Sequence, residues 1–381
     1  MPKFIHTADW QIGRQFTTFP PEDALPLAEA RLHAVQRIAE LAAQHQVDAV
    51  LVAGDVFDMQ TVSDRTIRRM FNAMQGYDGA WVMISGNHDA ALAESVWTRA
   101  VRLGAVPANV HLALNPEPLV LADLGLAVLP APLTQRHTYG DATAWFDQTQ
   151  TPASCVRVGL AHGSVQGVLP DDIDSANPIA PDRAERAKLD YLALGDWHGC
   201  KRIQDRVWYS GTPETDRFRG NDAGQALLVN IPAPGVLPEV TPLTVGQHAW
   251  HQLNVPLAVE SDVDVLLNTL QGLAASSVVS LTVTGQLPLW AHARVLSALA
   301  EAGARFRHLS CDTQALTLLP TADELASVRA DGYVAEILQD LRQAQSEPGE
   351  GGEAAAEAMT LLMQALLTRQ SVVTANPGGA A

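Results

Sequence analysis

Cysteine is scarce in this sequence, and the few cysteines are not arranged for bonding. Cys155, Cys200 and Cys311 stand far apart, are odd in number and have no ligand spacing. A secreted disulfide scaffold and a cysteine-based zinc site both need regularly spaced pairs of cysteines. We therefore expect three reduced thiols, in the core or at the surface.

Long apolar runs are also absent. The longest apolar stretch, 118–133, is broken by Asp123, Gly125, Pro130 and Pro132, whereas a helix that crosses a bilayer needs about 20 apolar residues. The beginning of the sequence shows no apolar segment followed by a small-residue cleavage site, which a secretory signal would require. We expect a cytoplasmic protein that does not contact the membrane.

Positive charge is in short supply. The sequence holds 25 Lys and Arg against 42 Asp and Glu, a net charge of −17, whereas proteins that bind nucleic acid usually present a basic surface. Part of the excess is local, because the residues from Thr321 onward hold nine acidic side chains against three arginines. Bound cations can also make a positive site in an acidic protein, so the composition weakens a DNA substrate without removing it.

The first part of the chain alternates between short apolar strands and amphipathic helices. Strands are predicted at 4–8, 48–53 and 81–84, and the second helix should be capped by Ser63 or Asp64. The apolar face of that helix is formed by Ile67, Met70, Phe71 and Met74. This alternation predicts an α/β layered fold, in which ligands gather at the carboxyl ends of the strands.

The composition changes along the chain and predicts four parts. A stretch with four prolines, 231–242, is interpreted as a boundary region. The predicted parts are a catalytic domain at 1–245, a small α+β domain at 246–320, a helical tail at 321–370 and a disordered terminus at 371–381. The small domain contains no clustered catalytic residues.

Polar side chains that can bind metal ions follow five of the predicted strands. They are Asp9, Gln11, Asp55, Asn87, His88, His162, Asp196 and His198. A carboxylate that can bridge two cations, flanked by nitrogen and oxygen ligands, describes a two-metal site with ions roughly 3.5–4 Å apart. Such ions bind a phosphodiester, supply a hydroxide and neutralise developing charge. Mixed carboxylate, amide and imidazole ligands suit manganese better than zinc.

Singly, these residues have ordinary structural explanations. Asp9 could cap the next turn, Asp55 could form an Asx-turn, and His162 could be a loop histidine. Together these explanations fail, because five independent strand ends would have to coincide. Gln11 is the weakest member of the set, since a neutral amide is a poor ligand.

Five ordered motifs resemble those of the calcineurin-like metallophosphoesterases. They are Asp9-x-Gln11, Gly54-Asp55, Gly86-Asn87-His88-Asp89, Ala161-His162-Gly163 and Gly195-Asp196-x-His198. The strings HTADWQIGR, LVAGDVFD and ISGNHD are most similar to SbcD-type DNA exonucleases, bacterial relatives of the nuclease subunit of the double-strand-break repair complex. The resemblance covers roughly the first 245 residues at motif level. It implies a four-layer α/β/β/α sandwich with a small α+β capping domain and a helical C-terminal tail.

The resemblance also implies roles for these residues. Asp9, Asp55 and His198 would hold the first of two divalent ions, and Asp55 would bridge to the second. Asn87 and His162 would complete the second position.

His88 would bind no metal and would protonate the leaving 3′ oxygen as a general acid.

Two positions depart from the family pattern, which has histidine at both. Gln11 and Asp196 each replace an imidazole with an oxygen donor, one at each metal. Oxygen donors favour Mn²⁺ or Mg²⁺ over tight zinc binding. A weakened site is the alternative.

The function that the resemblance implies is a metal-dependent DNA exonuclease or endonuclease that acts in DNA repair with an SbcC-like coiled-coil ATPase. The tail would dock on the ATPase, and helices near 63–74 and 96–103 would form a homodimer. The apolar stripe from Ile67 to Met74 would serve that dimer, with core packing as the alternative. Arg217 and Arg219 are placed to touch a phosphate backbone.

Two other functions stay open. One is a phosphodiesterase for a small molecule such as a nucleotide, or for a phosphoprotein, which the acidic composition favours. The other is a weakly active regulatory subunit of an ATPase complex, which rests on Gln11 and Asp196 alone.

Overall fold

The computed structural model divides into two compact units, residues 1–250 and 251–381, and each is described by itself. The described residues are 2–168, 176–319, 321, 333–345, 351–352, 354–355, 358–359 and 361–362. The predicted terminus at 371–381 and much of the predicted tail lie outside them. Within these ranges, no helix combines the length and apolar character needed to cross a membrane.

The first unit contains a six-stranded sheet in the order β14-β13-β1-β2-β3-β4. Its parallel strands are β1 (Lys3–Thr7), β2 (Ala49–Val52), β3 (Ala80–Met83) and β4 (Val110–Leu112). The antiparallel strands β13 (Gln225–Asn230) and β14 (Glu239–Thr244) extend one edge. The interpretation of 231–242 as a domain boundary is wrong, because Pro242 pairs with Leu227 inside β14. An edge strand tolerates proline since its outer N–H groups have no ladder partner.

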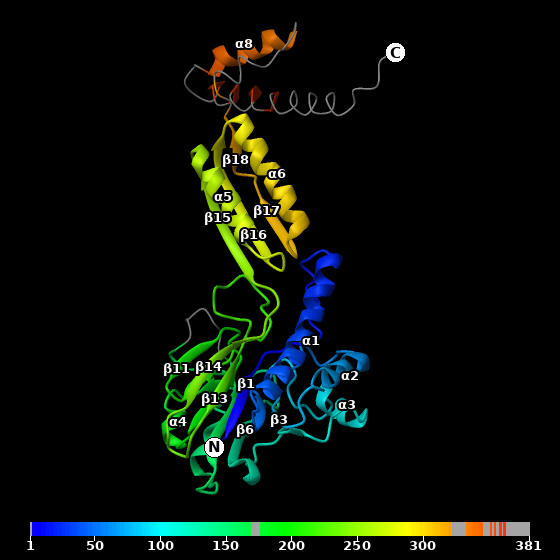
Figure 1. Cartoon of the computed structure of the whole chain (residues 1–381), viewed down its shortest axis with the longest axis vertical. Coiled ribbons are helices and arrows are strands. Elements are labelled where there is room, and N and C mark those ends of the chain that lie inside the picture. The colour runs from blue at the N-terminus through cyan, green and yellow to red at the C-terminus, as the bar shows by residue number, and fades with distance from the viewer. Residues whose placement is uncertain are drawn as a thin grey trace. The chain divides into compact units, whose positions relative to one another are not determined.

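Side chains along these strands alternate between two cores, which explains their continuous apolar sequences. Ile5, Val50 and Met83 face a core shared with the helices, whereas Leu51 and Val82 face the core shared with the second sheet. The helices are α1 (Pro21–Gln44), α2 (Asp64–Ala73) and α3 (Val96–Arg102). In Figure 1 they lie on one side of β1 and β3.

Helix α2 answers two of the sequence predictions. Ser63 is its cap, since the hydroxyl oxygen accepts the backbone N–H of Thr66 at 3.1 Å. Ile67, Met70, Phe71 and Met74 are all buried in the unit's own core. The prediction that this stripe forms a dimer interface is therefore wrong, and the alternative of core packing is correct.

The second sheet has the order β11-β12-β10-β7-β6-β5. Its strands are β5 (Leu119–Leu121), β6 (Leu126–Ala131), β7 (Val156–His162), β10 (Tyr191–Gly195), β11 (Lys201–Gln204) and β12 (Val207–Tyr209). Its four central strands are parallel. The outer face is covered by α4 (Arg183–Arg186) and a 3₁₀ helix, η2 (Ala144–Gln148). A short pair, β8 (Ser164–Val165) and β9 (Pro178–Ile179), follows β7.

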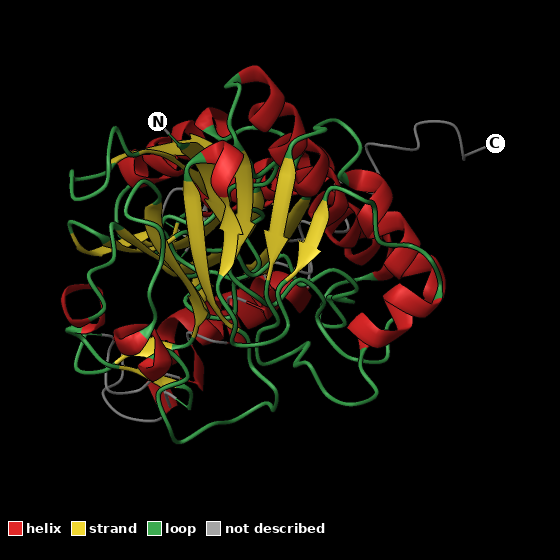
Figure 2. Cartoon of the chain, turned by 90° about the horizontal axis from the view of Figure 1, so that it is seen from below, coloured by secondary structure: helices red, strands yellow, loops and turns green. Residues whose placement is uncertain are grey.

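The first unit is therefore an α/β/β/α sandwich, and the predicted fold class is confirmed. The two sheets enclose a common core that includes Phe4 and Ala49 from one sheet and Val158 and Tyr191 from the other. Figure 2 shows the strands grouped together, with helices outside them.

The second unit has mixed α/β composition. Its sheet has the order β15-β16-β17, with β18 also paired to β16. The elements are β15 (Trp250–Leu257), α5 (Glu260–Gly272), β16 (Val278–Leu287), α6 (Leu289–Arg305), β17 (His308–Asp312) and β18 (Leu316–Leu318). A further helix, α8 (Tyr333–Gln345), contributes Leu338 to a small cluster with Met359. Strand β17 was not predicted, because its residues after His308 are mostly exposed and polar.

The close approach of the two sheets gives a first prediction. A Cβ on Gly195, at the end of β10, would overlap the carbonyl oxygen of Ala53 and lie 2.8 Å from Nδ1 of His162. We expect Gly195→Ala to reduce the free energy of unfolding by at least the roughly 1–3 kcal/mol of ordinary overpacking. Denaturant unfolding of both proteins measures this loss.

The matched control is Gly140→Ala, because a Cβ at Gly140 meets nothing within 4 Å. Equal stability of the two variants would contradict the predicted contact between the sheets.

Candidate metal centre

The carboxyl ends of strands from both sheets meet at one place. Asp9 follows β1, Asp55 follows β2, and Asn87 with His88 follows β3, while the second sheet supplies its ligands from the ends of β7 and β10. Each of the eight predicted residues contacts at least one other, through the distances given below. Strands run parallel toward this edge in both sheets, which is the reason their ends converge.

One group of ligand atoms surrounds His162. Its Nε2 lies 3.1 Å from Oδ1 of Asn87, 3.6 Å from Oδ1 of Asp55 and 3.7 Å from Oδ1 of Asp196. Its Nδ1 lies 2.8 Å from the carbonyl oxygen of Ala53 and donates to it. The lone pair is therefore on Nε2 and points toward the oxygens, as a metal-binding histidine requires.

A second group joins Gln11, Asp55 and His198. Nε2 of Gln11 lies 3.2 Å from Oδ2 of Asp55 and 3.3 Å from Nε2 of His198. Asp9 links the two groups, because both of its carboxylate oxygens lie 3.2 Å from the backbone N–H of Asp196. Ligand atoms of Asp9, Asp55 and His162 all lie within 4.8 Å of one another.

The backbone at this edge is strained. Asp9, Gln11, Asp55 and Asp196 have φ values of 55°, 46°, 53° and 99°, in the left-handed region that costs an ordinary residue about 1–3 kcal/mol. Glycine allows the close packing beside them, since a Cβ on Gly54 would lie 2.6 Å from Nδ1 of His162. The fold thus holds these ligands in conformations that the isolated chain would avoid.

Three buried carboxylates share this centre. Burial, with the charges of Asp55 and Asp196, holds the pKa of Asp9 well above its usual value. Burial raises the pKa of Asp55 to about 6 and also raises the pKa of Asp196. Burial lowers the pKa of His162 and of His198, so both imidazoles are neutral ligands. This donor set of carboxylates, an amide and neutral imidazoles fits hard divalent cations.

His88 stands beside the carboxylates without being a member of either group. Its backbone N–H donates to Oδ1 of Asp55 at 2.8 Å. Its Nδ1 lies 2.7 Å from the carbonyl oxygen of Asp58, which leaves Nε2 as the ring nitrogen available to a substrate.

Several supporting residues were missed by the sequence analysis. Arg31 is fully buried in α1, and its guanidinium donates to the carbonyl oxygens of Asp9 and Trp10 at 3.1 and 2.7 Å. Asp89 accepts three backbone N–H groups, from Val56, Phe57 and Gly86, and burial raises its pKa to about 7.

Asp216 is the third such residue, and it accepts from Nδ1 of His198 at 2.9 Å. Burial opposes ionisation, but the charges of His198 and Arg31 outweigh it and hold the pKa of Asp216 well below its usual range. Asp89 lies in a quoted motif, whereas nothing in the sequence points to Arg31 or Asp216.

Comparison with known proteins identifies this arrangement. Residues 2–168 match the family model described as calcineurin-like phosphoesterase. The chain contains a calcineurin-like metallophosphoesterase domain. This domain is that of a phosphoester hydrolase, a family that uses divalent metal ions.

Two relatives of the phosphoesterase chain share a name. Over 94 residues it is 39% identical to the SbcD subunit of the SbcCD nuclease of Rhodobacter capsulatus, which covers 23% of this chain and 22% of that protein. Over 326 residues it is 26% identical to the SbcD subunit of Escherichia coli K12, 76% of each chain. The crystal structure of TT1561 of Thermus thermophilus covers 64% of this chain and 99% of its own, with 11% identity and a TM-score of 0.42.

A cavity of about 290 Å³ opens onto the metal centre of the phosphoesterase domain. Its lining residues are Asp55, Asn87, His88, Asp196, Trp197, His198, Arg217, Arg219 and Asn221. The two arginines predicted to contact phosphate therefore lie beside the metal-binding side chains. Arg217 also donates from Nε to Asp216 at 3.1 Å.

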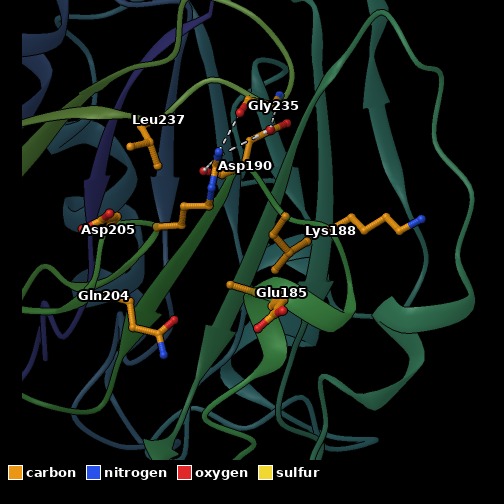
Figure 3. Close-up of a pocket in the computed structure, with 10 residues that line it drawn as sticks. Glu185, Lys188, Asp190, Gln204, Asp205, Gly235 and Leu237 are labelled. Carbon is orange, nitrogen blue, oxygen red and sulfur yellow. Dashed lines mark hydrogen bonds and ion pairs between the residues drawn. The ribbon is translucent and has the colours of Figure 1, made fainter.

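A larger cavity of about 600 Å³ lies elsewhere in the same domain and contains none of the predicted site residues (Figure 3). Its charged groups are used by the fold. Arg206 donates to the carbonyl oxygens of Asp190, Gly235 and Val236 at 2.7–3.0 Å. The Asp190 carboxylate accepts the backbone N–H of Gly235 at 2.6 Å. We assign it a structural role.

The crowded carboxylates predict how pH and metal change stability. A raised pKa in the folded state stabilises the protein at low pH, and this contribution is lost as pH rises through the folded value, about 6 for Asp55. Without metal, the melting temperature should therefore fall between about pH 4 and pH 7. Asp196→Asn removes one charge and should melt roughly 2–8 °C higher than wild type in chelator at about pH 7.5.

Added Mn²⁺ should reverse this order, because it neutralises the wild-type carboxylates and binds the variant less well. Scanning calorimetry with and without Mn²⁺ measures both effects. Asp123→Asn makes the same charge change at an exposed position and is the control. A chelated variant that is less stable than wild type would contradict the prediction.

Proposed function

We propose that the protein is a DNA nuclease that hydrolyses phosphodiester bonds with two divalent ions, Mn²⁺ or Mg²⁺. The observation that carries the proposal is the convergence of eight side chains, from two sheets, at a cavity that also contains two arginines. When bound, the ions would activate water and neutralise charge on the phosphate. The protein would act with an SbcC-like ATPase in DNA repair.

In this proposal the ligands divide as follows. Asp9, Asp55 and His198 would hold the first ion, and Asp55, Asn87, His162 and Asp196 would hold the second. Asp216 would fix the ring of His198, and the carbonyl oxygen of Ala53 would fix that of His162, so that each Nε2 presents its lone pair. Arg31 would position the backbone of Asp9.

The substrate is supported by two observations. The relatives in Rhodobacter capsulatus and Escherichia coli are named as subunits of a nuclease. The cavity also places Trp197 beside Arg217 and Arg219, which supplies an aromatic face and two cations for a phosphate backbone. Local positive charge of this kind offsets the acidity of the whole chain.

The direct test is hydrolysis of a labelled linear DNA duplex in Mn²⁺, with bis-p-nitrophenyl phosphate as the small substrate and Asp55→Ala as the inactive control. DNA cleavage that is lost in Asp55→Ala supports the nuclease. Cleavage of the small diester alone favours the small-molecule phosphodiesterase, and no turnover of either favours the regulatory subunit.

We predict that His88→Gln lowers kcat for DNA by roughly 10²–10⁴-fold, because a general acid contributes about that much. The number of bound Mn²⁺ ions should not change, since His88 binds no metal in this proposal. Single-turnover cleavage and isothermal titration of Mn²⁺ measure the two quantities. A loss of Mn²⁺ from the variant would instead assign His88 to the ligands.

Arg219 gives a test of substrate size. Arg219→Gln should reduce the slope of log KM for DNA against log salt concentration by about 0.9, the value of one phosphate contact. Turnover of bis-p-nitrophenyl phosphate should not change. Arg65→Gln, on the exposed face of α2, is the control. An equal change in both variants would remove Arg219 from the DNA path.

The remaining partners rest on the family resemblance. The helical tail would dock on the ATPase, and residues 251–319 would help to position DNA. A homodimer is still proposed, on a surface other than the buried stripe of α2.

A further inference from the structure

Gln11 has its side-chain amide fixed by three neighbours. The residue is buried, with 1% of its surface exposed. Oε1 accepts from Nη1 of Arg14 at 2.9 Å, while Nε2 faces Oδ2 of Asp55 at 3.2 Å and Nε2 of His198 at 3.3 Å. The amide thus turns its nitrogen, and not its oxygen, toward two of the ligands of the first ion.

The chemistry of the neighbours allows only this orientation. Arg14 can only donate, so it must face the amide oxygen, and the carboxylate of Asp55 can only accept, so it must face the N–H group. Reversing the amide would set oxygen against carboxylate and N–H against guanidinium. An orientation that is ambiguous from shape alone is therefore settled by its hydrogen-bond partners.

His198 agrees with this orientation. Its Nδ1 lies 2.9 Å from the buried carboxylate of Asp216, which fixes the ring proton on Nδ1 and leaves an acceptor at Nε2. Nη2 of Arg217 also lies 3.0 Å from Nδ1. Two donors cannot share that atom, and Arg217 has Asp216 as its partner. Nε2 of His198 therefore accepts from Gln11.

Arg14 adds a positive charge next to the first position. Its Nη1 lies 3.1 Å from Oδ2 of Asp216, the carboxylate that also holds His198, and 4.0 Å from Oδ1 of Asp58. The guanidinium is thus held in place beside Gln11 and would repel a divalent cation. The second position has four donors that already face one another around His162, and these contacts are made among carboxylate, amide and imidazole groups.

We infer that the two cation positions are unequal, because Gln11 is a hydrogen-bond donor to Asp55 and His198 rather than a ligand. The second position, made by Asp55, Asn87, His162 and Asp196, binds an ion tightly. The first position binds weakly and fills when a substrate phosphate supplies an oxygen and negative charge. This inference rests on the proposed metal site and departs from the expectation that Gln11 ligates.

The test is a titration of the metal-free full chain with Mn²⁺, followed by calorimetry and by electron paramagnetic resonance of the bound and free ion. Wild type should bind one ion tightly and a second at least about tenfold more weakly. Changes around a metal site alter affinity by roughly 10–100-fold, so Gln11→His should strengthen the weak step by at least that factor. Its spectrum should show two coupled ions at stoichiometric metal.

Gln11→Met distinguishes a donor from a ligand. It removes the amide at similar length, and the weak step should stay within about threefold of wild type, because a true ligand would be worth roughly 10–100-fold or more. Arg14→Met is a second variant, which frees the amide oxygen and removes the charge, and it should strengthen the weak step. Gln204→His adds an imidazole at an exposed position and should change neither step.

Two tight and equal steps in wild type would overturn the inference, and so would a loss of affinity above tenfold in Gln11→Met. Failure of the proposed function has a different signature. In that case wild type would bind no Mn²⁺ at either position, or would bind it and cleave no phosphodiester.

Discussion

Mutual repulsion among three buried carboxylates is the constraint on which the rest of this centre depends. Asp9, Asp55 and Asp196 lie at one edge, and their donors within the described part of the chain include backbone N–H groups and the amide of Gln11. Their raised pKa values measure how poorly the protein alone satisfies them. A site of this kind is built for divalent cations and is costly without them.

The rest of the sandwich offsets that cost. The apolar strands have both faces buried, which makes their ends rigid enough to keep four residues in left-handed conformations. Arg31 directs a fully buried charge at backbone carbonyl groups rather than at a carboxylate. The stability of the two cores is thus used to hold an arrangement that is locally unfavourable, as functional sites commonly require.

Much of this could be predicted from the sequence, for a physical reason. Parallel strands have apolar sequences, and their ends converge, so ligand-type residues after each strand had to meet. The orientation of Gln11 could not be predicted, because it depends on Arg14, Asp55 and His198 being assembled around it. Arg31 and Asp216 were missed for the same reason, since neither lies at the end of a strand. Pro242 misled the analysis because an edge strand tolerates a residue that usually ends one.

The ligands are divided between the two sheets, and this has a consequence for folding. Asp9 and the backbone of Asp196 are 187 residues apart in sequence, so an ion held by both sides would close a loop of that length. Closing a long loop removes much conformational freedom from the unfolded chain. In a protein with three scattered cysteines, a bound cation would thus act as a reversible cross-link, and removing it would separate the unfolding of the two sheets.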